Sequence, residues 1–448
     1  MFYDYLKSVF EDNKTRKAIV LDNNEIYYEE LLIKLKKVTE YLETTPVQTG
    51  SIVALIGDFS PNTIALFIEL IRLKCIIVPL TRKEKLKIDK LFEIAKPDFI
   101  FNVDEEDNIS FSEGVGTSSN VYYKAIKKLK HSGLVLFTSG TSGEPKAAVH
   151  DFEKLLKKFE QKGNTLVTIN FLMFDHWGGL NTMFHILSNG GSLVITKERT
   201  PEEICKLIEN HGVELLPASP TFLNLLLLSK LKNKYDLTTL KYISYGTEPM
   251  PQHTLSRLKA EFPGIKLLQT YGLIELGVMK SQSESNESLW VKLGGEGFQT
   301  RIVDDILQIK ADSAMLGYIN ADSPFTKDGW FITGDKVEQK GEYVRILGRK
   351  SEIINVGGEK VYPQEVENII LEMENVAEVT VYSEKNAIMG NIVCANIRLV
   401  EEQEKNVFLK DLKNYCKKRM EPYKLPIKIN LSRENQSGSR YKKKRFFS

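Results

Sequence analysis

The sequence has few of the features that mark secreted, metal-binding and membrane-spanning proteins. Its four cysteines lie far apart and form no C-x-x-C pair, so neither a disulfide framework nor a cysteine metal site is expected. No apolar run approaches the ~20 residues that a membrane-spanning helix needs. Residues 1–17 carry charges throughout, which excludes the continuous apolar core of a signal peptide. The expected compartment is therefore the cytoplasm, with reduced and mostly buried thiols.

Charge of one sign is not in excess, and the commonest nucleotide-binding loop is missing. The chain has 61 basic and 59 acidic residues, a formal net charge of +2. Such a balance provides no global attraction to nucleic acid or to an anionic membrane, and neither is expected as a partner. The G-x-x-x-x-G-K-[ST] loop of P-loop NTPases is absent.

With 448 residues the chain exceeds the ~250 to 300 at which one core usually stops growing, so at least two domains are expected.

Short β-branched segments alternate with helical patterns along most of the chain. Six segments are typical of strands: residues 51–58, 76–81, 133–140, 192–198, 212–219 and 240–248. Helical spacing lies between them, for example at residues 62–74 and 201–210. This order predicts an α/β fold with mostly parallel sheets and ligand sites at the carboxyl ends of strands. A helix opened by Pro363, two strands and a second helix predict a small α+β module at the end. The predicted domains are therefore residues 1–347 and 348–448.

The most informative segment is an apolar strand that ends in a loop rich in glycine and hydroxyl groups. Residues 134–137 lead into nine residues: Thr138, Ser139, Gly140, Thr141, Ser142, Gly143, Glu144, Pro145 and Lys146. Glycines let successive backbone N–H groups converge on phosphate oxygens, and the lysine adds a positive charge. A phosphate-binding loop is predicted here; a solvated turn after a strand is the alternative.

This loop resembles the signature loop of the adenylate-forming superfamily, which comprises acyl-CoA synthetases, peptide-synthetase adenylation domains and luciferases. Further segments resemble the family's motifs in the family's order: G-T-E-P at 246–249, T-Y-G-L-I-E at 270–275, G-W-F-I-T-G-D at 329–335 and G-R-K-S-E-I-I-N-V-G-G-E-K-V-Y-P-Q-E-V-E at 348–367. The resemblance implies a large N-terminal domain that binds ATP and an acid, and a small mobile C-terminal domain with a hinge near residues 349–351.

Activation of an acid by ATP is an attack of a carboxylate oxygen on the α-phosphorus, so the site must neutralise two anions that repel each other. The resemblance implies that Lys146 and Glu275 are catalytic and that Glu275 binds Mg²⁺. It implies ATP or AMP binding by Thr138, Ser139, Gly140, Thr141, Ser142, Gly143, Gly246, Thr247, Glu248, Tyr271, Gly272, Asp335 and Arg349. Among these, Asp335 would hold both ribose hydroxyls, Arg349 would reach the ribose, and Tyr271 would contact adenine by its face.

Each of these roles has a plainer alternative. Glu275 could equally be a solvent-facing glutamate at the start of a helix. Asp335 is typical of an Asx turn, and Arg349 of a surface ion pair. Tyr271 could equally be a core tyrosine.

The acid and thiol sites rest on resemblance as well. Residues 171–187 resemble the family's acid-binding wall, with His176, Trp177 and Gly178 in it. Amino-acid-activating relatives have an aspartate that falls on Trp177 here, which argues against an α-amino acid; a shifted register would give Asp175 that role. The glycines Gly357 and Gly358 resemble those that let the pantetheine arm of CoA approach the backbone.

Three departures from the family pattern affect the chemistry. The threonine that donates to the α-phosphate is replaced by Ile274, which has no donor, and the acidic hinge residue is replaced by Ser351. The C-terminal catalytic lysine of the family is replaced by Ser439. A K-x-x-R spacing reappears at Lys442 to Arg445, so Lys442 is predicted to be a displaced catalytic lysine, with a solvated basic tail as the alternative.

Two classes of function therefore stay open. The first is a stand-alone ligase that activates an aryl or fatty acid with ATP and Mg²⁺ and passes the acyl group to CoA or to the phosphopantetheine of an acyl carrier protein. An amino-acid adenylation enzyme is a variant of it. The second is a catalytically degraded relative that binds nucleotide or acid as a sensor or partner.

Overall fold

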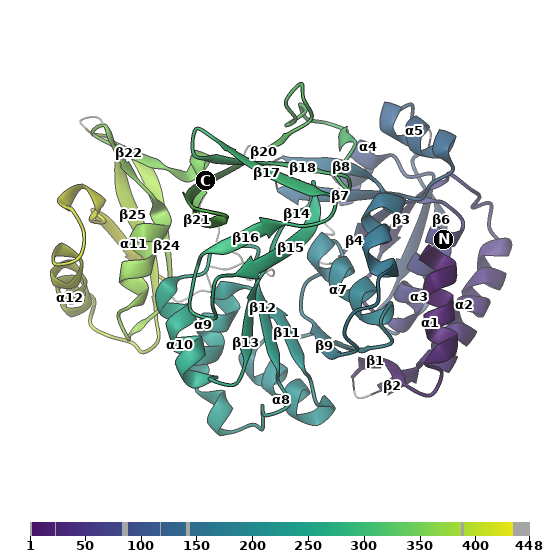
Figure 1. The fold of residues 1–448 in the computed structure, drawn as a ribbon, viewed down its shortest axis with the longest axis horizontal. Helices are drawn as coiled ribbons and strands as arrows, with labels where there is room; N and C mark the ends of the chain where they lie inside the picture. The colour runs from purple at the N-terminus through teal and green to yellow at the C-terminus, as the bar shows by residue number, and fades with distance from the viewer. Residues whose placement is uncertain are drawn as a thin grey trace.

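The chain is described by a computed structural model over residues 2–22, 24–82, 88–116, 118–139, 144–386 and 389–432, except for the side chain of residue 139. The described strands form three seven-stranded sheets and one five-stranded sheet. Figure 1 shows the first three sheets meeting near the middle of the molecule, with the fourth at one end. The predicted α/β fold with a smaller C-terminal unit is confirmed.

The first sheet is parallel at its centre and antiparallel at its edges. Its order is β19 (Gly317–Tyr318), β8 (Pro145–Asp151), β7 (Gly133–Ser139), β4 (Ile76–Leu80), β3 (Ile52–Ile56), β5 (Phe99–Val103) and β6 (Ile109–Glu113). The helices of this region are α3 (Pro61–Arg72), α4 (Ile88–Ala95) and α5 (Val121–Leu129). All five residues of β4 are buried, as expected for a parallel strand that is covered on both faces.

The second sheet is parallel except for its last pair. Its order is β13 (Lys266–Gln269), β12 (Tyr242–Tyr245), β11 (Leu215–Ala218), β9 (Val167–Asn170), β10 (Ser192–Ile195), β1 (Lys17–Leu21) and β2 (Asn24–Tyr27). The remaining helices of the large unit are α1 (Phe2–Asp12), α2 (Tyr28–Glu43), α6 (Phe152–Leu156), η2 (Lys157–Glu160), α7 (Trp177–Leu187), α8 (Pro201–His211), α9 (Pro220–Ser229), η3 (Leu231–Asn233) and α10 (Gln252–Glu261).

The third sheet is antiparallel throughout. Its order is β14 (Tyr271–Leu273), β15 (Gly277–Ser283), β16 (Val291–Gly294), β21 (Tyr343–Arg349), β20 (Phe331–Lys340), β18 (Ile306–Ala311) and β17 (Phe298–Val303). The predicted domain division between residues 347 and 348 falls inside β21, two residues before that strand ends. It stays a prediction.

The C-terminal part packs around a core of its own, formed by residues between Ile354 and Leu431. It contains η4 (Lys350–Glu352), β22 (Ile354–Val356), β23 (Glu359–Val361), α11 (Pro363–Leu371), β24 (Val376–Asn386), β25 (Gly390–Leu399), α12 (Lys405–Lys417), η5 (Pro422–Lys424) and β26 (Lys428–Leu431). The helix predicted to open at Pro363 does begin there, because proline suits the first helical position. Its contact with the large unit includes a hydrogen bond of 2.9 Å from the Asn224 side chain to the Ala377 carbonyl.

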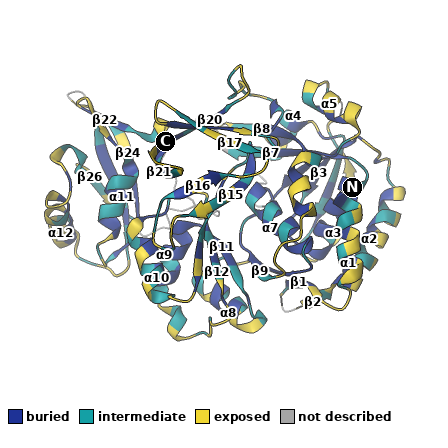
Figure 2. Cartoon of the chain, viewed as in Figure 1, coloured by how far each residue is buried: buried dark blue, intermediate teal, exposed yellow. Residues whose placement is uncertain are grey.

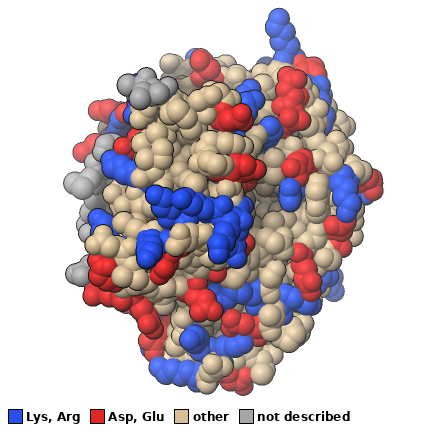
Figure 3. Space-filling view, turned by 90° about the vertical axis from the view of Figure 1, so that its left-hand side faces the viewer, with Lys and Arg blue, Asp and Glu red and all other residues tan. Residues whose placement is uncertain are grey.

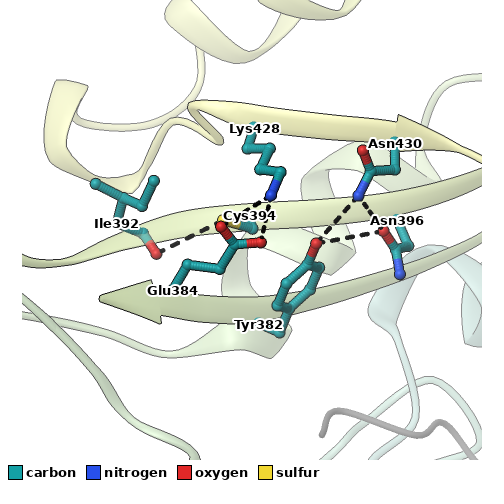
Figure 4. Close-up of polar contacts among 7 residues, drawn as sticks. All are labelled: Tyr382, Glu384, Ile392, Cys394, Asn396, Lys428 and Asn430. Atoms are coloured by element: carbon teal, nitrogen blue, oxygen red, sulfur yellow. Dashed lines mark hydrogen bonds and ion pairs between the residues drawn. The ribbon is translucent and has the colours of Figure 1, made fainter. Parts of the chain in front are cut away.

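Strand β26, the last described element, is joined to the sheet by side-chain contacts as well as by backbone pairing. It runs parallel to β25, and Figure 4 shows polar side chains of β24, β25 and β26 meeting on one face. Lys428 Nζ lies 2.8 Å and 2.9 Å from the two carboxylate oxygens of Glu384. The Asn430 amide donates to Tyr382 Oη at 3.2 Å and to Asn396 Oδ1 at 3.1 Å.

Burial follows the sheets, and the outer surface is polar. Figure 2 shows buried residues along the strands and exposed residues on the outward sides of the helices. All four cysteines are buried and unbonded, as predicted. Figure 3 shows a group of basic side chains on the face that lies at the left of Figure 1. Helix α12 exposes Lys410, Lys413 and Lys417. None of the described helices combines the length and the apolar character needed to cross a bilayer.

Candidate active site

Asp335 and Arg349 lie side by side because they are opposite each other in the pairing of β20 with β21. The guanidinium Nε of Arg349 is 3.4 Å from Asp335 Oδ1. From β14, at the edge of the same sheet, Tyr271 donates its hydroxyl to Asp335 Oδ2 at 2.5 Å. Gly334 has a φ of +74°, a left-handed conformation that glycine adopts without strain, just before the carboxylate. Three predicted nucleotide-binding residues therefore converge.

The side chains of this group differ in exposure, and burial and neighbouring charges shift their pKa values. The Asp335 side chain is 10% exposed, whereas the Arg349 side chain keeps 46% of its surface accessible. Burial, followed by the negative charge of Asp335, raises the pKa of the Tyr271 hydroxyl well above its usual range, so it stays a donor. Burial opposes the charge on Arg349, but Asp335 and Glu275 outweigh it and raise the pKa of the guanidinium. Arg349 thus links the Asp335 group electrostatically to Glu275.

Glu275 lies between β14 and β15, and a tyrosine that the sequence analysis did not identify fixes its carboxylate. The Tyr318 hydroxyl donates to Glu275 Oε1 at 2.5 Å. Burial, followed by the charge of Glu275, raises the pKa of Tyr318 far above its usual range. Tyr318 belongs to β19, which pairs with β8, and the ammonium of Lys146 on β8 lies 5.6 Å from the centre of its ring. The two predicted catalytic residues therefore flank one tyrosine.

The predicted phosphate loop joins two paired strands. Thr138 at the end of β7 faces Lys146 at the start of β8 in the antiparallel register. The residues Gly140, Thr141, Ser142 and Gly143 lie outside the described residues. The lysine therefore follows the loop at the strand end where parallel sheets commonly hold ligands.

The G-T-E-P turn follows β12 and packs tightly. A Cβ on Gly246 would lie 2.5 Å from Thr270 Oγ1, so only glycine fits, and Thr247 has a φ of +70°. Glu248 accepts a hydrogen bond of 2.8 Å from the backbone N–H of Thr221. Its carboxylate is thus engaged with α9, and nucleotide binding by these residues stays a prediction. Gly272, within β14, is similarly crowded: a Cβ there would be 3.0 Å from the Gly277 carbonyl.

The predicted acid wall lies at the start of α7. His176 is the N-cap residue, and its Nδ1 accepts a hydrogen bond of 3.0 Å from the Gly178 N–H. Trp177 is 2% exposed, and its ring centre lies 6.2 Å and 6.4 Å from those of Phe152 and Phe159. Trp177 is thus part of the buried aromatic core. The acid-binding roles of these residues stay predictions.

The predicted thiol-acceptor glycines lie apart from this cluster in the present arrangement. Gly357 and Gly358 form the turn of the β22–β23 hairpin with φ values of +58° and +96°. The Gly357 N–H donates to the Met389 carbonyl at 2.9 Å, and Figure 1 shows β22 at the outer end of the C-terminal part. The predicted catalytic residue Lys442 lies outside the described residues.

For a divalent cation, the site offers the carboxylate of Glu275 and not a preformed set of several protein ligands. No group of three or more His, Cys, Asp or Glu side chains with metal-ligand geometry occurs among the described residues. Glu275 nevertheless offers a hard oxygen ligand of the kind that Mg²⁺ prefers when it arrives on nucleotide phosphates.

Comparison with known proteins agrees with this arrangement. The family model described as AMP-binding enzyme matches residues 6–306, and that of the AMP-binding enzyme C-terminal domain matches residues 365–437. Indoleacetate–CoA ligase of Aromatoleum aromaticum is 25% identical, with 94% of this chain and 91% of that protein covered. D-alanine–D-alanyl carrier protein ligase of Staphylococcus aureus is 24% identical, with 95% and 93% covered.

The fold is shared with solved ligases. The structure of o-succinylbenzoate CoA synthetase from Bacillus subtilis with its acyl-adenylate intermediate has a TM-score of 0.78 at 20% identity, covering 98% of this chain and 96% of that one. An anthranilate CoA ligase in complex with anthranoyl-AMP has a TM-score of 0.82 at 17% identity, covering 98% and 94%. The sequence motifs, their convergence and the two family matches lead to one conclusion: the chain belongs to the AMP-binding enzyme family of the adenylate-forming superfamily.

Proposed function

We propose that this chain uses ATP to convert a carboxylic acid into an acyl adenylate, releases pyrophosphate, and passes the acyl group to the thiol of CoA or of a carrier-protein pantetheine. One observation carries the proposal. Tyr318 contacts both Glu275 and Lys146, Asp335 contacts Tyr271 and Arg349, and the charge of Arg349 interacts with that of Glu275, although these residues come from distant parts of the chain. Family membership supports the same chemistry.

The residues of the cluster divide the work of adenylation. A carboxylate oxygen attacks the α-phosphorus, the bond to the β-phosphate oxygen breaks, and pyrophosphate leaves with its electron pair. Lys146 would supply positive charge to the phosphates, where negative charge accumulates, a preorganised stabilisation of the transition state. Tyr271 and Arg349 hold the Asp335 carboxylate in one orientation, as a directed hold on the ribose hydroxyls requires.

Magnesium fits this site as an ion carried by ATP, with Glu275 as its oxygen ligand from the protein. When bound, it would screen the repulsion between the phosphates and the incoming carboxylate. The contribution of the chain is to hold the Glu275 carboxylate in place through Tyr318.

We propose an aryl or fatty acid as the substrate. An α-amino acid needs a carboxylate to pair with its ammonium group. Amino-acid-activating relatives have an aspartate for this purpose, and the matching position in this chain is Trp177, which is buried among aromatic rings. Asp175, two residues earlier, is the alternative partner and is 8% exposed. D-alanine therefore belongs in every substrate panel.

Transfer to a thiol requires Gly357 and Gly358 to come closer to the cluster than they lie in this arrangement. We propose that the C-terminal part, residues 348–448, rotates about a hinge near residues 349–351. Arg349 would then lie at this hinge as the last residue of β21.

The test is pyrophosphate release from ATP with a panel of aryl, fatty, dicarboxylic and amino acids, followed by thioester formation with CoA and with a carrier protein. We expect one acid class to release pyrophosphate, and Lys146→Met to abolish the release. ATP binding without pyrophosphate release for any acid would favour the second candidate, a degraded relative. Ile274, which lacks the donor of the family threonine, is the observation behind that candidate.

A further inference from the structure

Asn320 follows the short strand β19 and binds the backbone on both sides of the predicted catalytic residue Lys146. Its side-chain oxygen accepts a hydrogen bond of 3.0 Å from the Ala147 N–H. Its side-chain nitrogen donates to the Pro145 carbonyl at 2.9 Å. An asparagine side chain carries an amide with a donor and an acceptor, as a backbone peptide does, so it can take the place of a paired strand.

The strand that carries Lys146 needs such a partner on this side. Among the described residues, the pairing of β19 with β8 covers only Ala148 and Val149. A further backbone hydrogen bond of 2.9 Å runs from the Ile319 N–H to the Ala147 carbonyl. On the opposite side, β7 pairs with every residue of β8. The Asn320 amide therefore extends the pairing of β8 on its second side to the strand end that carries the lysine.

Residues 315–320 contact both predicted catalytic residues. The Met315 N–H donates to the Glu275 carbonyl at 2.7 Å, and the Tyr318 hydroxyl donates to the carboxylate of Glu275. The ring centre of Tyr318 lies 5.6 Å from the ammonium of Lys146. The hydrogen bonds of the asparagine that ends this segment go to the strand of the lysine. One short segment thus joins the glutamate beside the third sheet to the lysine of the first.

We propose that Asn320 is a positioning residue for adenylation, which fixes the backbone of residues 145–147 so that Lys146 points at the phosphates of ATP. Asn320 is exposed, so water can replace its amide and each hydrogen bond contributes little to stability. The reaction rate is more sensitive, because a shift of about 1 Å in a group that acts on the transition state can cost ~10²-fold. This inference rests on the proposed function, because it concerns the same site.

Asn320→Ala tests the inference with the acid that releases pyrophosphate. We expect the rate of pyrophosphate release at saturating ATP to fall by about 10- to 100-fold. Transfer from a supplied acyl adenylate to the thiol should stay nearly unchanged, because the pyrophosphate has already left. The Mg²⁺ concentration for half-maximal release should also stay unchanged, since Tyr318 still holds Glu275. Asp322→Ala, a change at an exposed residue two positions further on, should alter neither half-reaction.

The outcomes separate this inference from the proposed function. A parental rate of pyrophosphate release in Asn320→Ala overturns the inference and leaves the proposed function standing. Equal losses in the two half-reactions with a lower melting temperature also overturn it and assign Asn320 a structural role only. A higher Mg²⁺ requirement overturns it as well, because Asn320 would then act through Glu275.

A parent that releases no pyrophosphate with any acid contradicts the proposed function, and equilibrium binding of ATP then decides the inference. Weaker binding by Asn320→Ala than by Asp322→Ala supports it, and equal binding overturns it.

Discussion

His150 should make the protein less stable as the pH falls below about 6.5. Its side chain on β8 is fully buried, and neither ring nitrogen has a hydrogen-bond partner among the described residues. Burial lowers the pKa of the imidazole from 6.5 to about 4, and the nearby backbone of Ile274 and Ser313 favours the charged ring only weakly. The unfolded chain therefore takes up a proton on this residue at a higher pH than the folded chain does.

The sign and the size of the effect follow from linkage. Because the folded pKa is below the unfolded one, the stability is fully present above pH ~6.5 and is lost as the pH falls towards ~4. One pKa unit corresponds to about 1.4 kcal/mol, so the full loss is about 3 kcal/mol. Between pH 7.5 and pH 5 the share of His150 alone is about 2 kcal/mol.

Denaturant unfolding at these two pH values measures this share. His150→Leu removes the titration and places an apolar side chain of similar size at this fully buried position. The fluorescence of the buried Trp177 follows the unfolding of the large unit. The loss of stability from pH 7.5 to pH 5 should be about 2 kcal/mol larger for the parent than for His150→Leu, since all other titrating groups cancel in this difference.

Equal pH dependence of parent and variant would refute the reasoning, because the imidazole would then not be buried in its neutral form. His150→Asn is a second variant without titration in this range, for use if leucine does not fit. An opposite sign, with the variant losing more stability than the parent, would mean that the folded protein favours the imidazolium ion.

Four further predictions concern the active site. Asp335→Ala should weaken the use of ATP by about 1.5 to 3 kcal/mol, seen in the KM for ATP or in turnover; no change in either removes Asp335 from the site. Tyr318→Phe should raise the Mg²⁺ concentration needed for half-maximal pyrophosphate release, because it frees the Glu275 carboxylate; superimposable Mg²⁺ titrations would contradict this. Ile274→Thr should hold or raise the rate of adenylation, and a large loss of rate with an intact circular dichroism spectrum would show that isoleucine lines the site. Lys442→Ala should slow adenylate formation by ~10² to 10³, with transfer from a supplied acyl adenylate nearly unchanged; equally small effects on both half-reactions would identify a solvated tail.

The sequence by itself determined the elements and the family. Alternating apolar strands and helical spacings predicted mostly parallel sheets. The second sheet and the centre of the first are parallel, whereas the third sheet is antiparallel, and the helix predicted at Pro363 does begin there. The family was identified from the motif segments and their order along the chain. These signals are readable because they are local: the period of a helix or strand, the φ preference of glycine and the position of proline act over a few residues. The G-T-E-P turn was identified by its resemblance to a family motif, and the structure adds that a Cβ at Gly246 would clash with Thr270.

Only the tertiary structure decided which side chains touch. Tyr271 meets Asp335 across 64 positions, and Tyr318 meets Glu275 across 43. Tyr318 belongs to no motif, and nothing in its neighbourhood in the sequence marks it. Such contacts depend on strand register and on the packing of helices against sheets, which the whole chain determines. Burial depends on the same packing, and it raises the pKa of the Tyr271 hydroxyl well above its usual range.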